Sequence, residues 1–133
     1  MNTALANRPT LLLVDDSIAQ RDFYEFVLQQ HFQITTASRG ADAVALAAAE
    51  RPRVIVLDVM MPGLTGWETC TRIKSDPTTA DIPVILLTGV DDVDLTQHAV
   101  AVGADAVLHK PCSADRLLDC VHHALAKHDA PDR

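Results

Sequence analysis

Cysteines are few in this chain of 133 residues. There are three of them, an odd number, so they cannot all be paired in disulfides within the chain. Cys70, Cys112 and Cys120 form no CxxC motif and show no Cys/His spacing typical of a metal site. The pattern supports neither a disulfide framework nor a cysteine-based metal site. We expect free thiols in a reducing compartment.

Long hydrophobic runs and an excess of basic residues are missing as well. The first ten residues have no apolar core of signal-peptide length, and no stretch approaches the length of a membrane span. With 11 Lys and Arg against 18 Asp and Glu, the formal net charge is −7, which disfavours direct binding to nucleic-acid phosphates. We therefore expect a cytoplasmic protein with neither a membrane nor a nucleic acid as a direct partner.

The composition is that of one globular domain. A hydrophobic content of 48% and a charged content of 22% are ordinary for such a domain. The sequence contains no repeat, linker or low-complexity segment. We expect a flexible leader over residues 1–9, a single domain over 10–127 and a tail over 128–133.

Apolar, β-branched segments alternate with helical patterns five times along the chain. Strands are expected over residues 10–14, 33–37, 54–58, 82–87 and 105–108, and helices over 17–30, 41–50, 67–75 and 91–102, with a last helix after Ser113. In the first helix, Phe23 and Val27, with Tyr24 and Leu28 beside them, are expected to face the core. The alternation predicts an α/β fold with a doubly wound, five-stranded parallel sheet, helices on both faces and the flavodoxin-like order 2-1-3-4-5.

The segment from Val54 to Gly63 is the one around which the chain is organised. Four apolar residues lead directly into Asp58, so this strand is expected to be buried on both faces, and Pro62 and Gly63 place a loop after it. Open α/β sheets bind their ligands at the carboxyl ends of the strands. An isolated Asp at a strand end more often caps a turn, so the other strand ends must decide its role.

The other strands end in residues of matching chemistry. Asp15 and Asp16 follow the first strand, Thr88 the fourth and Lys110 the fifth. In the order 2-1-3-4-5, these groups and Asp58 open onto one crevice. Carboxylates this close must bind protons or a cation, and Mg²⁺ suits oxygen ligands and phosphate. With Lys110 and Thr88 as donors, the set predicts transfer of a phosphoryl group to Asp58.

Four motifs carry a resemblance to a known family. They are Leu11–Asp16 (LLLVDD), Leu57–Gly66 (LDVMMPGLTG), Leu86–Gly89 (LLTG) and His109–Pro111 (HKP). Over about residues 10–127, the chain resembles the CheY-like receiver domain of bacterial two-component response regulators. This resemblance implies phosphorelay signal transduction, in which a sensor histidine kinase or a phosphotransfer protein donates a phosphoryl group from a phosphohistidine.

The resemblance also implies a role for each residue at the crevice. Asp58 would be the phosphoacceptor and would share in binding Mg²⁺. Asp16 would bind the metal directly, Asp15 largely through water, and Met60 through its backbone carbonyl. The peptide bond before Pro111 would be cis.

Thr88 and Lys110 would contact the phosphoryl oxygens, but one other position departs from the family pattern. Three residues before the lysine the family usually has Tyr or Phe, whereas this chain has Val107, so the aromatic half of the usual switch is absent. Met60 and Val90 flank the site where many members carry polar side chains. We expect them to alter the lifetime of the acyl phosphate.

Two other functions are open at this point. One is a phosphorylation-independent adaptor with a silent site. The other is an aspartate-nucleophile phosphatase of the haloacid-dehalogenase kind, although that family needs a second Asp two residues after the first, where this chain has Met60. The receiver hypothesis predicts a signalling protein rather than an enzyme, apart from loss of its own phosphoryl group. Its output would be an unknown downstream protein or a homodimer through the last two helices.

Overall fold

The computed structural model describes residues 8–89 and 94–129 of the chain. Most of the expected leader and tail, Val90 and the first part of the helix expected over 91–102 lie outside these ranges. Where the description begins, the chain already contacts the sheet. The carbonyl oxygens of Arg8 and Pro9 accept hydrogen bonds from the side chain and the backbone of Gln33, at 2.8 and 2.9 Å.

The strands form one parallel sheet. They are β1 (Thr10–Val14), β2 (Gln33–Ala37), β3 (Val54–Asp58), β4 (Val84–Thr88) and β5 (Ala106–His109). Their order is β2-β1-β3-β4-β5, as predicted from the sequence. β3 and β4 are buried along their whole length, which explains their continuous apolar sequences. β4 ends one residue later than expected, so Thr88 belongs to the ladder and lies opposite His109.

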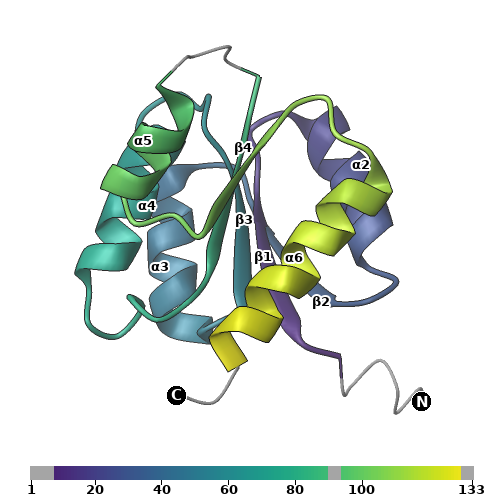
Figure 1. Ribbon diagram of the computed structural model, residues 1–133, viewed down its shortest axis with the longest axis horizontal. Helices are drawn as coiled ribbons and strands as arrows, with labels where there is room; N and C mark the ends of the chain where they lie inside the picture. The colour runs from purple at the N-terminus through teal and green to yellow at the C-terminus, as the bar shows by residue number, and fades with distance from the viewer. Residues whose placement is uncertain (1–7, 90–93, 130–133) are drawn as a thin grey trace.

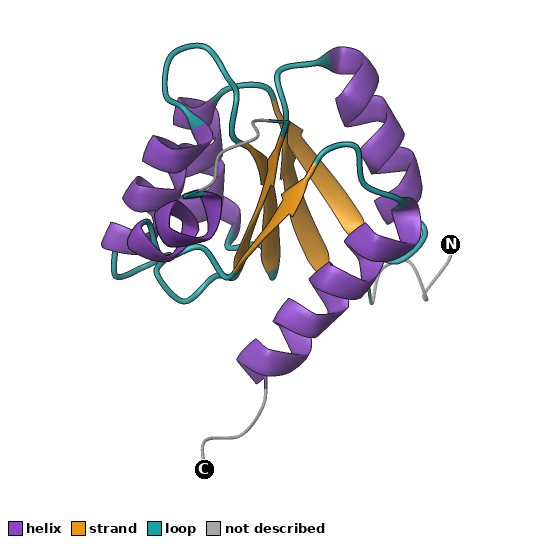
Figure 2. Ribbon diagram, turned by 45° about the horizontal axis from the view of Figure 1, so that its top comes forward, coloured by secondary structure: helices purple, strands orange, loops and turns teal. Residues whose placement is uncertain are grey.

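Helices cover both faces of the sheet (Figures 1 and 2). They are α2 (Ile18–Leu28), α3 (Gly40–Glu50), α4 (Gly66–Ser75), α5 (Leu95–Ala101) and α6 (Ala114–Asp129). α2 and α6 lie on one face, and α3, α4 and α5 on the other. This arrangement confirms the predicted doubly wound fold. None of the helices in the described part of the chain is both long enough and apolar enough to cross a bilayer.

Alternate side chains of each strand enter two separate hydrophobic clusters. In β1, Leu11 and Leu13 pack with residues of α2 and α6, whereas Leu12 and Val14 pack with residues of α3 and α4. The same alternation holds in β3 and β4. In β1, β3 and β4, polar residues therefore stand only at the strand ends.

The prediction that Phe23 faces the core is wrong. Its side chain is 51% exposed, while Tyr24, Val27 and Leu28 are buried. These three residues are spaced i, i+3 and i+4, which defines the stripe that contacts the sheet. Phe23 lies one residue earlier, at the edge of that stripe, and its ring meets the ring of Tyr24 edge-on at 5.2 Å between centroids.

Side-chain caps start two helices close to the strand ends. The Ser17 hydroxyl accepts a hydrogen bond from the backbone N–H of Gln20 at 3.3 Å and begins α2 two residues after Asp15. Thr65 and Glu68 form a reciprocal capping box that begins α4. Three residues separate β1 from α2, and seven separate β3 from α4.

Candidate functional site

Acidic side chains meet at the carboxyl ends of β1 and β3, which are neighbours in the sheet. Asp15 follows β1 directly and Asp58 is the last residue of β3; both are buried, whereas Asp16 is exposed. One carboxylate oxygen from each of the three lies within 4.8 Å of the others. Within residues 8–89 and 94–129, no second group of three or more His, Cys, Asp or Glu side chains gathers in this way.

Lys110 brings a positive charge into this acidic group. Its Nζ lies 3.0 Å from Asp58 Oδ1 and 3.3 Å from Asp15 Oδ2, and it also donates to Oε1 of Gln20. The side chain is largely buried. Its backbone is held as well: the N–H of Lys110 donates to the carbonyl oxygen of Thr88 at 2.7 Å, and the bond to Pro111 is cis.

The start of α2 holds Asp15 from the opposite side. The backbone N–H of Ser17 donates to Asp15 Oδ1 at 2.9 Å, and the guanidinium of Arg21 donates to the Asp15 carbonyl oxygen at 2.9 Å. The sequence analysis did not identify Gln20 or Arg21 as site residues. No local pattern could have identified Gln20, because its contact with Lys110 spans 90 residues.

Burial governs the ionisation of Asp58. Loss of water around its carboxyl group raises the pKa above the ordinary value of 3.8, and the neighbouring Asp15 adds to the increase. The hydrogen bond and charge of Lys110 and the backbone N–H of Met60 lower the pKa and offset part of this increase. A buried carboxylate with a raised pKa beside one specific cationic partner is typical of a functional site.

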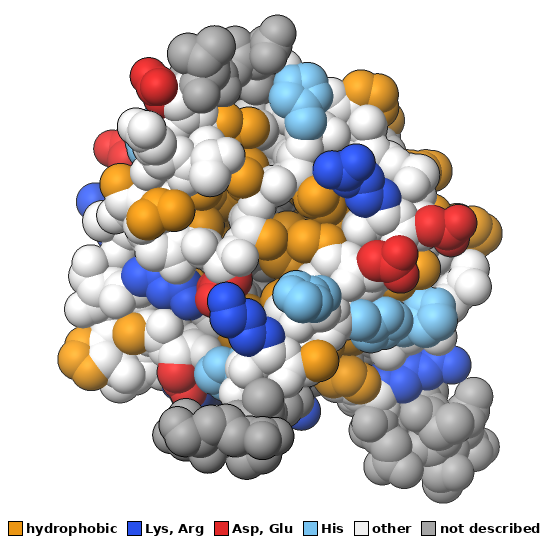
Figure 3. All heavy atoms as spheres, viewed as in Figure 1, with side chains coloured by type: hydrophobic (Ala, Val, Ile, Leu, Met, Phe, Trp, Pro, Cys, Tyr) orange, Lys and Arg blue, Asp and Glu red, His pale blue; other side chains and the backbone are white. Residues whose placement is uncertain are grey.

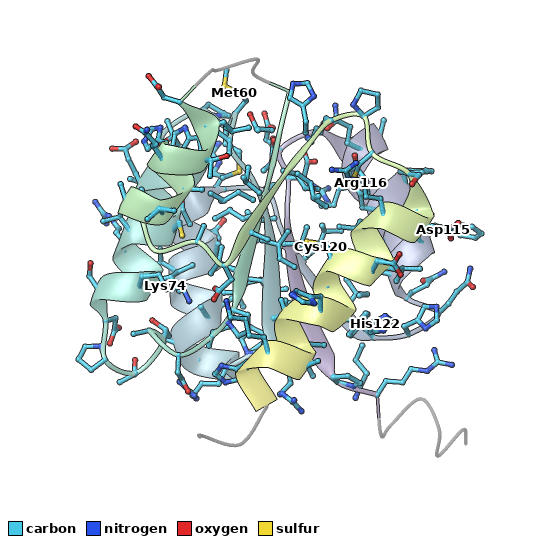
Figure 4. The ribbon with its side chains drawn as sticks, in the orientation of Figure 1. Met60, Lys74, Asp115, Arg116, Cys120 and His122 are labelled. Atoms are coloured by element: carbon cyan, nitrogen blue, oxygen red, sulfur yellow. The ribbon has the colours of Figure 1, made fainter. Side chains whose placement is uncertain are left out.

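Thr88 and Met60 lie at the same edge of the sheet. Thr88 is fully buried at the end of β4, next to the residue that pairs with Asp58 in the sheet. Met60 lies just beyond β3 with a side chain 60% exposed, at the upper end of the molecule in Figure 4. The structure therefore places the predicted site residues from four strand ends at one rim of the sheet.

The donor set at this rim fits Mg²⁺. Carboxylate oxygens are the ligands that a hard dication prefers, and Mg²⁺ usually binds to one or two carboxylates and keeps several waters. Asp16, the exposed member of the three, leaves the group open to solvent and hence to a hydrated cation.

The histidines of α6 lie away from this rim. Figure 3 shows histidine side chains on the face where α6 lies, and Figure 4 labels His122 well along that helix. The ring of His122 packs against those of His31 and Phe32, with centroids 5.6 and 5.7 Å apart. These contacts place His122 in an aromatic cluster with His31 and Phe32.

Known proteins resemble this chain in both sequence and fold. The sequence model of the response regulator receiver domain matches residues 11–122. The chain belongs to this family. Receiver domains are signalling domains that interact with histidine kinases or phosphotransfer proteins. This receiver is 35% identical to the protein PilH of Pseudomonas aeruginosa over 117 residues, which cover 87% of this chain and 97% of PilH.

Other relatives are longer proteins. The response regulator PleD of Caulobacter vibrioides is 40% identical over 102 residues, which cover 76% of this chain but 22% of PleD. The transcriptional regulatory protein AfsQ1 of Streptomyces coelicolor is 42% identical over 121 residues, or 90% of this chain and 52% of AfsQ1. Among solved structures, the chemotaxis protein CheY4 of Vibrio cholerae has a TM-score of 0.83 at 32% identity, and the match covers 88% of this chain and 98% of that chain.

Val107, where the sequence departs from the expected aromatic residue, belongs to β5. Its side chain packs against the hydrophobic cluster that Trp67 and Val102 also contact. His98 of α5 stacks on Trp67 of α4, with ring centroids 3.8 Å apart and planes 14° from parallel. An aromatic contact therefore joins α4 to α5, although residue 107 has no ring.

Proposed function

We propose that this receiver accepts a phosphoryl group on the carboxylate of Asp58. The observation that carries the proposal is the contact of Lys110 Nζ with Asp58 Oδ1 at 3.0 Å, inside the acidic group with Asp15 and Asp16. At this rim, the buried carboxylate can act as the nucleophile, and the lysine beside it supplies a positive charge. Membership of the receiver family supports the same assignment.

The proposed reaction exchanges one phosphorus bond for another. A carboxylate oxygen of Asp58 forms a bond to phosphorus while the bond from phosphorus to the donor breaks. In a phosphohistidine donor, the ring nitrogen keeps the electron pair. Lys110 and the Thr88 hydroxyl donate to the oxygens of the phosphoryl group as it moves. Mg²⁺, held by Asp15, Asp16, Asp58 and the carbonyl of Met60, would supply further positive charge.

We infer that the donor is a phosphohistidine on a sensor histidine kinase or a phosphotransfer protein. The output would be altered affinity for a downstream protein, or for a second copy through α5 and α6. A phosphoryl group that stabilises one conformation shifts the population toward that conformation. The family supports the class of donor. The cognate kinase and the downstream protein would be identified by phosphotransfer profiling and affinity capture.

Labelling with a small phosphodonor tests the assignment of Asp58. The protein is incubated with acetyl phosphate and Mg²⁺, and the product is analysed by intact mass and by peptide mapping. We expect one phosphoryl group per chain, labile in acid and located on Asp58. The Asp58→Asn variant should take up none, because an amide is not a nucleophile of this kind. Trp67, the one tryptophan in the sequence, gives a second signal through its fluorescence.

The same experiment separates the competing functions. Repeated turnover of generic phosphomonoesters would favour the phosphatase. Absence of both label and fluorescence change, with beryllofluoride as well as acetyl phosphate, would favour the adaptor. Full labelling of Asp58→Asn would contradict the choice of nucleophile.

A further inference from the structure

The ammonium group of Lys110 has three N–H bonds and, within the described residues, three side-chain acceptors. Two are the carboxylates of Asp15 and Asp58, at 3.3 and 3.0 Å. The third is Oε1 of Gln20, a neutral amide oxygen. A lysine ammonium offers three donors and no acceptor, so this set saturates it. Of the three partners, Gln20 alone takes a hydrogen bond without neutralising the charge.

Gln20 is itself held in place relative to the acids. It lies in the first turn of α2, where its backbone N–H donates to the hydroxyl of Ser17. The N–H of Ser17 donates to the carboxylate of Asp15, and the next residue, Arg21, donates to the carbonyl oxygen of Asp15. The turn that carries Gln20 is therefore attached to Asp15 at two points.

Gln20 also occupies the solvent side of Lys110. It is exposed, whereas Asp15 and Asp58 are buried. The ring of Tyr24 lies on another side of the lysine, with its centroid 6.0 Å from Nζ. A lysine side chain is a flexible stem with a point charge, and its orientation depends on its partners. Without Gln20, the ammonium would be free to turn toward water.

We propose that Gln20 is a positioning residue, which holds the Lys110 ammonium at the mouth of the site so that it meets the phosphoryl oxygens on Asp58. This inference rests on the proposed function. When the phosphoryl group arrives, Lys110 exchanges its bond to Asp58 Oδ1 for a bond to a phosphoryl oxygen. The bonds to Asp15 and Gln20 remain as two fixed points.

Gln20→Met tests this role, because methionine is similar in size and lacks the amide acceptor. With acetyl phosphate and saturating Mg²⁺, the rate of Asp58 labelling should fall about three- to tenfold, as expected for loss of one typical hydrogen bond. Gln30→Met is the matched control, since Gln30 is also exposed but follows the other end of α2, and it should label like the wild type. The free energy of unfolding should be unchanged in both variants.

A double-mutant cycle shows whether Gln20 acts through Lys110. In a Lys110→Ala background, Gln20→Met should cause no further loss of rate. A merely structural role would lower the rate by the same factor in both backgrounds. Equal losses, or a wild-type rate in Gln20→Met, would overturn the proposal.

A second measurement is independent of phosphorylation. Reductive methylation of lysines, followed by mass spectrometry, reports how freely each amine leaves its partners. Lys110 should react several-fold faster in Gln20→Met, while Lys74, bonded to Ile82 and Asp105, serves as the internal reference. If the wild type takes no label, the proposed function fails, and the reactivity of Lys110 still decides: no change between wild type and Gln20→Met would refute the role of Gln20.

Discussion

Opposing effects set the pKa of the Asp58 carboxyl group. Burial and Asp15 favour its neutral form, whereas Lys110 favours the charged form. The net result is a raised pKa, so ionised Asp58 destabilises the folded state when no metal is bound. The folded state is thus less stable at the residue that we propose as the phosphoacceptor.

Replacing Asp58 by Asn should therefore stabilise the fold at neutral pH. Below pH 3.8, Asp58 is protonated in both the folded and the unfolded wild type. As the pH rises, the unfolded chain loses the proton first, so the free energy of unfolding of the wild type falls until the raised pKa is passed. In EDTA, urea denaturation should show Asp58→Asn to be more stable at pH 7 by about 1 kcal/mol, with the gain vanishing toward low pH.

A control for this prediction is Asp76→Asn. Asp76 is a partly exposed acid at the C-terminal end of α4, and hydrogen bonds from Thr78 lower its pKa. That variant should not be stabilised at neutral pH. A destabilised Asp58→Asn at pH 7 would mean that the pairing of Asp58 with Lys110 outweighs burial and repulsion.

At the scale of elements, the first residue of α4 contacts the end of β3 and the residue after it. The backbone N–H of Gly66 donates to the carbonyl oxygen of Val59 at 2.8 Å, and a Cβ at Gly66 would collide with the carbonyl oxygen of Asp58. The next residue, Trp67, stacks on His98 of α5. The loop after Asp58, α4 and α5 are therefore joined by a continuous series of contacts.

Gly66→Ala should destabilise the protein by about 2 kcal/mol, because the added methyl group meets backbone that cannot move without displacing β3. Gly89→Ala is the matched control: no described atom lies within 4 Å of a Cβ there, and its free energy of unfolding should change by less than about 0.5 kcal/mol. Urea denaturation of the two variants measures both values. Similar values for Gly66→Ala and Gly89→Ala would show that the start of α4 adapts.

At the scale of the whole molecule, the sheet order brings together side chains from distant parts of the chain. Lys110 reaches Asp15 across 95 residues and Asp58 across 52. Because β1 and β3 are neighbours and β4 and β5 follow on the same side, one rim collects four strand ends. A cation bound there would connect several elements at once and stabilise the folded state by mass action.

Mg²⁺ should therefore raise the thermal midpoint of unfolding, with a gain of about 2.7 kcal/mol when the metal is at a hundred times its Kd. Asp16→Ala should lose most of this gain, because it removes the exposed carboxylate of the acidic group. Differential scanning calorimetry with and without Mg²⁺ measures the difference. Equal gains in the wild type and in Asp16→Ala would show that Asp16 is not a ligand.

Much of this architecture could be predicted from local patterns. The apolar run before Asp58 predicted a central strand, and Ser17 predicted the start of a helix, because each depends on neighbours along the chain. Phe23 was misplaced since both it and Tyr24 belong to apolar i, i+4 pairs, and only the angle of α2 on the sheet decides which of them is buried. The contact between His98 and Trp67 has no sequence signal, because it depends on how two separate helices pack.

The sequence by itself determined the succession of strands and helices, the strand order that the family shares, and the residues that end each strand. The tertiary structure decided which of those residues meet, which are buried, and that Gln20 of α2 contacts Lys110. The physical reason is distance along the chain. Periodicity and capping act over a few residues, whereas the partners of a lysine at the end of β5 are set by the register of the whole sheet.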